Sequence, residues 1–348
     1  MSIVPSRKAL YITGSDVPRL LTMSDAIRVV EDAFRARASG GAADHARYRM
    51  RTPEAAAASP SAESGSPAVN PAGKAAGRAM MHVLGGTLSA HGVLGTKTYV
   101  TTPSGAQFVV LLFSVEGHLL AVIEANVLGQ IRTGAASGVA TKHLALPNAS
   151  VMAVIGAGFQ ARAQVEAVCA VRSIREVRVF SRTPARVDRF VGAMRFAIEA
   201  EVRGVDSIET AVEGADVICT ATTSVSPVLT CTHLRPGVHV NAMGSNAPTR
   251  RELDESAVLA ADLIVVDDLL QAQAEAGDLI AVANAGRLAW SDVTALADVV
   301  SGRVRRADAR AVTLFESQGL ATEDLAVARH VYEGATRAGL GIALPLSE

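Results

Sequence analysis

The sequence has few cysteines and almost no net charge. Its three cysteines, Cys169, Cys219 and Cys231, show no C-x-x-C spacing and fall in apolar or strand-forming segments. This pattern favours buried thiols in a reducing compartment over a disulfide framework or a zinc site. The formal net charge of -1 in 348 residues gives no basis for binding nucleic acid or an anionic membrane.

Long apolar runs and paired metal ligands are also missing. No segment approaches the length of a membrane span, and the first residues lack the apolar core of a signal peptide. The eight histidines are scattered, with none at ligand spacing, so we expect no metal site. We therefore expect a cytoplasmic protein, and its length suggests about two domains.

A strand–turn–helix pattern dominates the middle of the chain. The apolar run 151–155 predicts a buried strand, and Gly156, Gly158 and Ala161 follow as a G-x-G-x-x-A turn that opens a helix and includes Phe159 and Gln160. A second strand is expected over 177–180. In this context the turn predicts a dinucleotide site, with the pyrophosphate at the helix N-terminus. The alternative is a Rossmann scaffold without the cofactor.

The end of that second strand predicts which dinucleotide is preferred. An acidic residue there would accept the ribose hydroxyls of NAD. The sequence instead has Ser181, Arg182 and Thr183, with Arg186 one helical turn further on. Thr183 is also the expected N-cap of a helix that begins at Pro184. Hydroxyl and guanidinium groups can hold a 2′-phosphate, so we expect NADP(H) to be preferred and NAD(H) to remain possible. An arginine here can also simply stack on adenine.

Further parallel strands are expected over 217–221, 238–243 and 263–266, with 201–205 a weaker candidate. Ligands of such sheets bind at the carboxyl ends of strands. The expected cofactor contacts there are Thr220, Ala221, Thr222, Met243 and Gly244.

The N-terminal part predicts a separate α+β unit. Ser24 is the expected N-cap of a helix that ends at Gly40, with Arg28–Asp32 and Glu31–Arg35 pairs on its solvated face. A strand then places Arg47, Arg49 and Arg51 on one face. Residues 54–74 are rich in Ala, Ser, Pro and Gly and are expected to be flexible. Strands over 79–84, 92–100, 108–115 and 118–124 follow, the last two as a hairpin.

Two cations in this half stand out. Lys97 lies among strand-forming residues, where it is either snorkelling or functional. Arg132 lies in the first turns of a helix expected over 126–144, next to Thr133, which is an expected cofactor contact. A cation there opposes the helix dipole, so its position makes sense if an anion sits beside it. The small residues of this helix fit either ligand approach or interdomain packing.

The sequence resembles the ornithine cyclodeaminase/mu-crystallin family. The matching segments are Gly95–Tyr99, Ile131–Ala135, Val154–Ala161, Ala215–Thr222, Asn241–Asn246, Arg251–Leu253, Glu275–Asp278, Phe315–Gly319 and Glu323–Ala328. The resemblance implies an α/β fold in which a Rossmann dinucleotide-binding domain (128–319) is inserted in a smaller α+β domain for substrate binding and dimerisation. That smaller domain comprises 1–127 and 320–348, with a flexible insertion at about 54–78. Homodimers are usual in the family.

The resemblance also implies roles for individual residues. Arg47, Lys97 and Arg132 would bind an amino-acid carboxylate near the nicotinamide, and Lys97 could supply a proton. Cyclodeaminases carry an aspartate where this chain has Asn246, and an asparagine cannot accept a proton. We therefore expect an NAD(P)H-dependent reductase of α-imino acids. Its substrates would be cyclic ketimines such as pyrroline-2-carboxylate or piperideine-2-carboxylate, or the open-chain imine of an alanine dehydrogenase. The alternatives are an ornithine or lysine cyclodeaminase and a non-catalytic, crystallin-like protein that binds NADPH and a small ligand.

Overall fold

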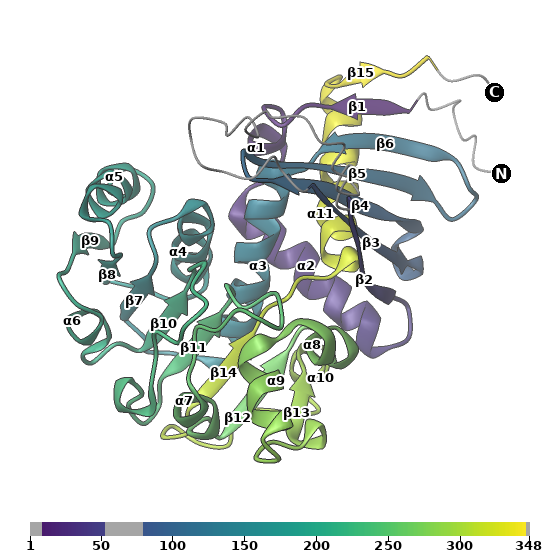
Figure 1. Ribbon diagram of the computed structural model, residues 1–348. Helices are drawn as coiled ribbons and strands as arrows, with labels where there is room; N and C mark the ends of the chain where they lie inside the picture. Colours follow the sequence, from purple (N-terminus) through teal and green to yellow (C-terminus); the bar gives the residue numbers. More distant parts are fainter. Residues whose placement is uncertain (1–8, 53–78, 346–348) are drawn as a thin grey trace, which may run out of the picture.

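The computed structural model describes residues 9–52 and 79–345. Two β-sheets stand side by side, with the helices α2 (Met23–Ala38), α3 (Asn126–Leu144) and α11 (Ala321–Ala338) between them (Figure 1). The predicted flexible insertion, residues 54–78, lies outside the described residues. Within the described part, no helix is both long and apolar enough to cross a membrane.

The first sheet is mixed and has the order β15-β1-β6-β5-β4-β3-β2. Strands β2 to β6 pair antiparallel in sequence order, and β1 adds parallel to β6. The predicted β5–β6 hairpin is confirmed. The bounds are β1 (Leu10–Ile12), β2 (Ala43–Arg51), β3 (Met80–Leu88), β4 (Val93–Thr102), β5 (Gly105–Ser114), β6 (Leu119–Glu124) and β15 (Ile342–Ala343).

The second sheet is wholly parallel in its described strands, with the order β13-β12-β14-β11-β10-β7-β8-β9. Its bounds are β7 (Val151–Ile155), β8 (Glu176–Phe180), β9 (Glu201–Gly204), β10 (Val217–Thr220), β11 (His239–Ala242), β12 (Leu263–Val266), β13 (Val293–Ala295) and β14 (Thr313–Glu316). The strand order reverses at β7, which leaves a crevice at its carboxyl end, next to the fingerprint turn. Sequence reasoning missed β13 and β14.

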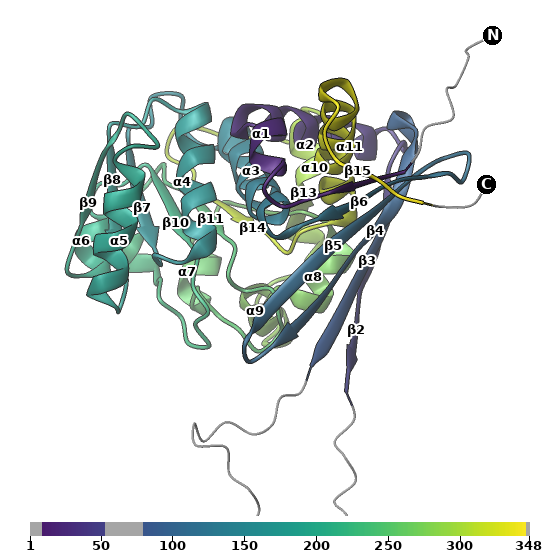
Figure 2. The ribbon, with the colours of Figure 1, turned by 90° about the horizontal axis from the view of Figure 1, so that it is seen from above.

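The helices cover both faces of this second sheet and fill the space beside the first (Figure 2). The predicted range of α3 is confirmed. The bounds are α1 (Val17–Leu20), α2 (Met23–Ala38), α3 (Asn126–Leu144), α4 (Phe159–Val171), α5 (Pro184–Met194), α6 (Ile208–Val212), α7 (Glu255–Leu259), α8 (Leu269–Glu275), α9 (Gly277–Asn284), α10 (Leu296–Val300) and α11 (Ala321–Ala338).

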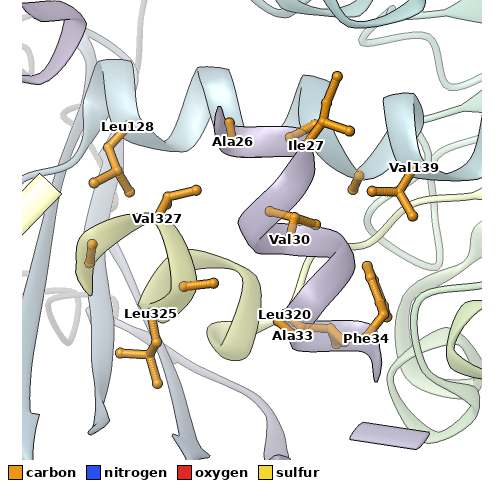
Figure 3. Packing of buried hydrophobic residues seen from close by; sticks show 14 of the residues in the cluster. Ala26, Ile27, Val30, Ala33, Phe34, Leu128, Val139, Leu320, Leu325 and Val327 are labelled. Carbon is orange, nitrogen blue, oxygen red and sulfur yellow. The ribbon is translucent and has the colours of Figure 1, made fainter. Parts of the chain in front are cut away.

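The largest core lies where α2, α3 and α11 pack together between the two sheets (Figure 3). Ile27 and Phe34 of α2, Val139 of α3 and Leu325 of α11 are buried in it. Helix α3 also packs so closely on α4 that a Cβ at Gly134 would lie 2.4 Å from the carbonyl oxygen of Ala163. Part of the small-residue character of α3 is therefore packing.

Several local predictions about α2 are wrong. Thr22, not Ser24, caps the helix, since its hydroxyl accepts from the Asp25 amide. Glu31 is buried and not solvated, because the side chains of Lys142 and His143 on α3 reach it in addition to Arg35. These two contacts join residues 111 and 112 positions apart, which helical periodicity alone does not reveal.

Several further expectations also differ from the structure. Arg28 pairs with Asp25 instead of Asp32. Thr183 stands before α5, but its side chain makes no capping hydrogen bond. Cys231 is exposed, against the expectation of a buried thiol, because it lies in a short turn on the surface.

Candidate functional site

A cavity of about 870 Å³ lies between the first sheet, the start of α3 and the fingerprint turn. The loops after β11 and β14 close it from the other side. It brings together residues that are distant in the sequence. The predicted site residues that line it are Arg47, Lys97, Arg132, Thr133, Phe159, Gln160, Met243 and Asn246.

The strand β2 presents its three arginines to this cavity, as the alternation predicts. The side chain of Arg47 is almost fully buried, and its Nη2 donates to the carbonyl oxygen of Gln318 at 2.6 Å. Its Nη1 lies 3.1 Å from the Glu275 carboxylate, and Arg49 Nη1 lies 2.6 Å from the same carboxylate. The buried carboxylate of Glu275 therefore forms ion pairs with two guanidinium groups.

Lys97 and Arg132 meet at the N-terminus of α11. Lys97 Nζ lies 2.9 Å from Asp324 Oδ1, and Arg132 Nε lies 2.8 Å from the same oxygen. Arg132 Nη1 contacts Glu323 at 2.9 Å. The anion that the position of Arg132 predicts is thus present within the protein, and Asp324 lies 192 positions further along the chain.

Burial shifts the proton affinities of this cluster. Desolvation, followed by the nearby Arg132 charge, lowers the pKa of Lys97 to about 8. Desolvation and the neighbouring Asp267 raise the pKa of Glu323 well above its usual range. Burial opposes the charge of Arg132, but Asp324 and Glu323 outweigh it and raise the pKa of that guanidinium. Lys97 can therefore exchange a proton near neutral pH.

Two glycines make room for these cations. A Cβ at Gly129 would lie 3.2 Å from Lys97 Nζ, and a Cβ at Gly319 would lie 2.4 Å from Arg132 Nη1. Gly319 also has φ +82°, a conformation that favours glycine. Any side chain at position 319 would therefore displace the Arg132 guanidinium.

The turn formed by Gln318 and Gly319 is fixed by a buried carboxylate behind it. Asp267 accepts hydrogen bonds from the backbone amides of both residues. The same turn supplies the carbonyl oxygen that Arg47 binds. Asp267 therefore fixes the turn that accepts from Arg47 and that leaves room for Arg132 at Gly319.

The fingerprint turn has the geometry that a dinucleotide requires. Gly156 has φ +112°, and a Cβ there would lie 2.4 Å from the carbonyl oxygen of Ala221, so only glycine fits. A Cβ at Gly158 would meet nothing within 4 Å, which leaves the start of α4 open to a ligand. The buried Oε1 of Gln160 accepts no hydrogen bond from the described residues. The residues present therefore fit a bound dinucleotide.

The strand ends beside this turn are held by a residue that sequence reasoning did not assign, Glu252. Its carboxylate accepts from the Thr220 hydroxyl at 2.7 Å, the Thr222 amide at 2.6 Å and the Gly244 amide at 2.7 Å. The Thr220 hydroxyl thus donates its hydrogen bond within the protein, to Glu252. Glu252 belongs to the Arg251–Leu253 segment that carries the family resemblance, and this was its only signal in the sequence.

A second cavity, of about 460 Å³, lies beside the fingerprint. Gly158 and Phe159 line it together with Arg186 and Arg189 of α5. Arg189 follows Arg186 by three residues and shares its helix face, a spacing that sequence reasoning overlooked. Ser181, Arg182 and Thr183 lie at the end of β8, and Arg182 and Thr183 are exposed.

Asn246 lies in the loop after β11 and lines the main cavity. Its Oδ1 accepts from Arg250 Nη1 at 3.2 Å, and its carbonyl oxygen accepts from Arg49 Nη2 at 3.1 Å. Two guanidinium groups therefore converge on this one neutral residue. Among residues 9–52 and 79–345, no group of three His, Cys, Asp or Glu side chains is placed to hold a metal ion.

The parallel sheet, its fingerprint turn and the order reversal at β7 define a Rossmann-type α/β protein. Comparison with known proteins then identifies the family. The model of the ornithine cyclodeaminase/mu-crystallin family matches residues 7–339, and the chain belongs to this family.

Individual relatives agree with this assignment. A Δ1-pyrroline-2-carboxylate reductase of Bacillus cereus is 37% identical over 258 residues, which are 71% of this chain and 79% of the relative. The solved structure of the Thermococcus litoralis Δ1-pyrroline-2-carboxylate reductase in complex with NADH and L-proline matches with a TM-score of 0.85. It is 31% identical and covers 97% of this chain and 100% of that chain. An archaeal alanine dehydrogenase dimer with bound NAD also matches with a TM-score of 0.85, at 30% identity over 98% of this chain and 100% of that chain.

Proposed function

We propose that this protein is an NAD(P)H-dependent reductase that converts α-imino acids to L-amino acids. One observation carries the proposal: Arg47, Lys97 and Arg132 line the same cavity as Phe159 and Gln160 of the fingerprint turn. A cluster of cations that can bind a carboxylate and a dinucleotide turn thus share one cavity. The bound dinucleotide would supply hydride from its nicotinamide ring.

The side chains of the cavity have separate tasks in this proposal. Arg47 and Arg132 orient the substrate carboxylate through charge-assisted hydrogen bonds, which fixes the Cα for hydride transfer. Lys97 gives a proton to the imine nitrogen and is poised to do so because its pKa is about 8. Asp324 holds the Lys97 ammonium in place at 2.9 Å.

Asn246 argues against cyclodeamination as the main activity. Ring closure of a diamine requires loss of a proton from its side-chain ammonium, and an aspartate at this position would assist that loss. Here the amide of Asn246 already accepts from Arg250. A guanidinium beside the amide repels an ammonium group, so the site disfavours ornithine and lysine.

For the coenzyme, we propose a preference for NADPH over NADH. Arg186 and Arg189 line the cavity beside Gly158, where the adenosine end of a dinucleotide would lie, and Ser181 and Arg182 follow β8 nearby. We expect a lower KM for NADPH than for NADH. Arg186→Ala should reduce the difference in binding free energy between the two coenzymes by about 1–3 kcal/mol, the value of a charge-assisted hydrogen bond. A tenfold preference of the unmutated protein for NADH would contradict this.

We propose a homodimer in which the residues before 128 and after 319 provide the interface. The first sheet, formed by β1–β6 and β15, supports this division because both chain ends contribute to it. Sedimentation velocity of the purified protein tests the dimer. The cytoplasmic location stays a prediction from the sequence.

The reaction itself is tested by following NADPH absorbance with a panel of imines. Cyclic ketimines and mixtures of 2-oxo acids with ammonium should oxidise NADPH and yield one L-amino acid per NADPH consumed. The variant Lys97→Met should lose about 10²–10⁴-fold in kcat, the usual contribution of a proton donor. A protein that binds NADPH but reduces none of the imines would instead support the crystallin-like binding function.

A further inference from the structure

The main cavity holds more positive charge than one carboxylate requires. Its described lining includes six cationic side chains and neither aspartate nor glutamate; the cations are Arg47, Arg49, Arg51, Lys97, Arg132 and Arg250. Three carboxylates behind the wall, Glu275, Glu323 and Asp324, pair with some of them. The cavity therefore favours an anionic occupant.

Two of these cations are not needed to bind the substrate's α-carboxylate. Arg49 and Arg250 both contact Asn246, the first at its carbonyl oxygen (3.1 Å) and the second at its side-chain oxygen (3.2 Å). Both acceptors are neutral. Within residues 9–52 and 79–345, Arg49 has one carboxylate partner, Glu275, and it shares that partner with Arg47. The two guanidinium groups can therefore form charge-assisted hydrogen bonds with a further anion.

We infer that the substrate is a dicarboxylic α-imino acid, whose second acid group binds Arg49 and Arg250 beside Asn246. This inference rests on the proposed reductase function and specifies its substrate. The α-carboxylate binds Arg47 and Arg132, and Lys97 lies beside the imine nitrogen. Hydride from NAD(P)H adds to Cα, the C=N double bond becomes a single bond, and a proton adds to nitrogen, so that the product is an acidic L-amino acid.

The test compares pairs of 2-oxo acids that differ in charge but hardly in shape. Oxaloacetate is matched with 4-methyl-2-oxopentanoate, and 2-oxoglutarate with 5-methyl-2-oxohexanoate, each with ammonium and NADPH. In each pair an isopropyl group replaces the distal carboxylate. We expect kcat/KM to be about 10- to 100-fold higher for at least one of the dicarboxylates than for its partner, as a charge-assisted interaction provides.

Variants locate the effect within the cavity. Arg250→Gln should reduce kcat/KM for the dicarboxylate at least about tenfold more than for its uncharged partner, and Arg250→Lys should restore part of the difference. The control is Arg287→Gln, which removes an exposed arginine paired with Glu255 and should leave both rates unchanged. A binding readout uses the NADP⁺ complex, in which L-aspartate or L-glutamate should raise the melting temperature more than L-leucine does.

The outcomes separate this inference from the function on which it rests. If no imine of either class oxidises NADPH, the proposed function itself fails. If pyrroline-2-carboxylate or the branched substrates are reduced as well as or better than both dicarboxylates, the reductase function stands and the inference is overturned. An equal loss on both members of a pair in Arg250→Gln would also overturn it, because that residue would then be structural.

Discussion

At the residue scale, the site works through buried charges that share partners. Asp324 Oδ1 contacts both Lys97 and Arg132, while Glu275 contacts both Arg47 and Arg49. Burial makes such sharing strong, because a charge without a partner in a low-dielectric interior is costly. The same burial that orients Lys97 also lowers its pKa to about 8 and so brings its titration into the working range.

The titration of Lys97 predicts a pH profile. Because the protonated ammonium is the proton donor and its pKa is about 8, imine reduction should fall by about tenfold per pH unit above that value. Oxidation of the amino acid, which needs the neutral amine, should rise over the same range. Initial rates from about pH 6 to 10 test this, with Lys142→Arg as a control that should keep the profile. A reduction rate that stays flat across this range would exclude Lys97 as the donor.

Gly319 provides a second test at this scale. Gly319→Ala and Gly40→Ala both place alanine at a positive φ, near +80°, and each should cost about 1–2 kcal/mol of stability. Only the Cβ at 319 would meet Arg132, since nothing lies within 4 Å of one at Gly40. Substrate KM should therefore rise in Gly319→Ala alone. Equal KM values in the two variants would show that the Arg132 position does not matter.

At the element scale, the turn between β7 and α4 contains one glycine that the fold requires and another that ligand binding requires. Gly156 is fixed by its backbone conformation and by its contact with Ala221, whereas Gly158 faces open space. The sequence predicted this turn correctly, because the spacing of its glycines reflects both the tight turn at Gly156 and the close approach of a ligand at Gly158. Helix α3 was predicted for a similar reason, as its start, end and length are all local properties.

These two glycines predict opposite consequences. Gly156→Ala should lower stability by about 2–4 kcal/mol, because it combines a positive φ with a backbone clash. Gly158→Ala should melt like the unmutated protein but weaken NADPH binding by about 10- to 100-fold, because the added methyl group blocks close approach to the pyrophosphate. Thermal melts and fluorescence titrations with NADPH measure the two effects. Equal NADPH affinity in Gly158→Ala would place the pyrophosphate elsewhere.

At the scale of the whole molecule, the contacts that complete the site join distant parts of the chain. Strands β13 and β14 are only three and four residues long, and β14 has a polar residue at each end, Thr313 and Glu316, so neither strand stands out in the sequence. The partners of Lys97 and Arg132 come from α11, and that of Arg47 comes from α8. Pattern reasoning singled out Lys97 and Arg132 because each looks unusual where it stands, whereas the role of Arg47 came from the family resemblance. Pattern reasoning could not identify their carboxylates, which only the packing of the two sheets brings near.

The most direct test of the account measures what the protein does with a preformed imine and with ornithine under the same conditions. Imine and NADPH should give one L-amino acid for each NADPH oxidised, and ornithine with catalytic NAD⁺ should release little or no ammonia. Robust formation of ammonia and proline from ornithine, without reduction of any imine, would contradict the account.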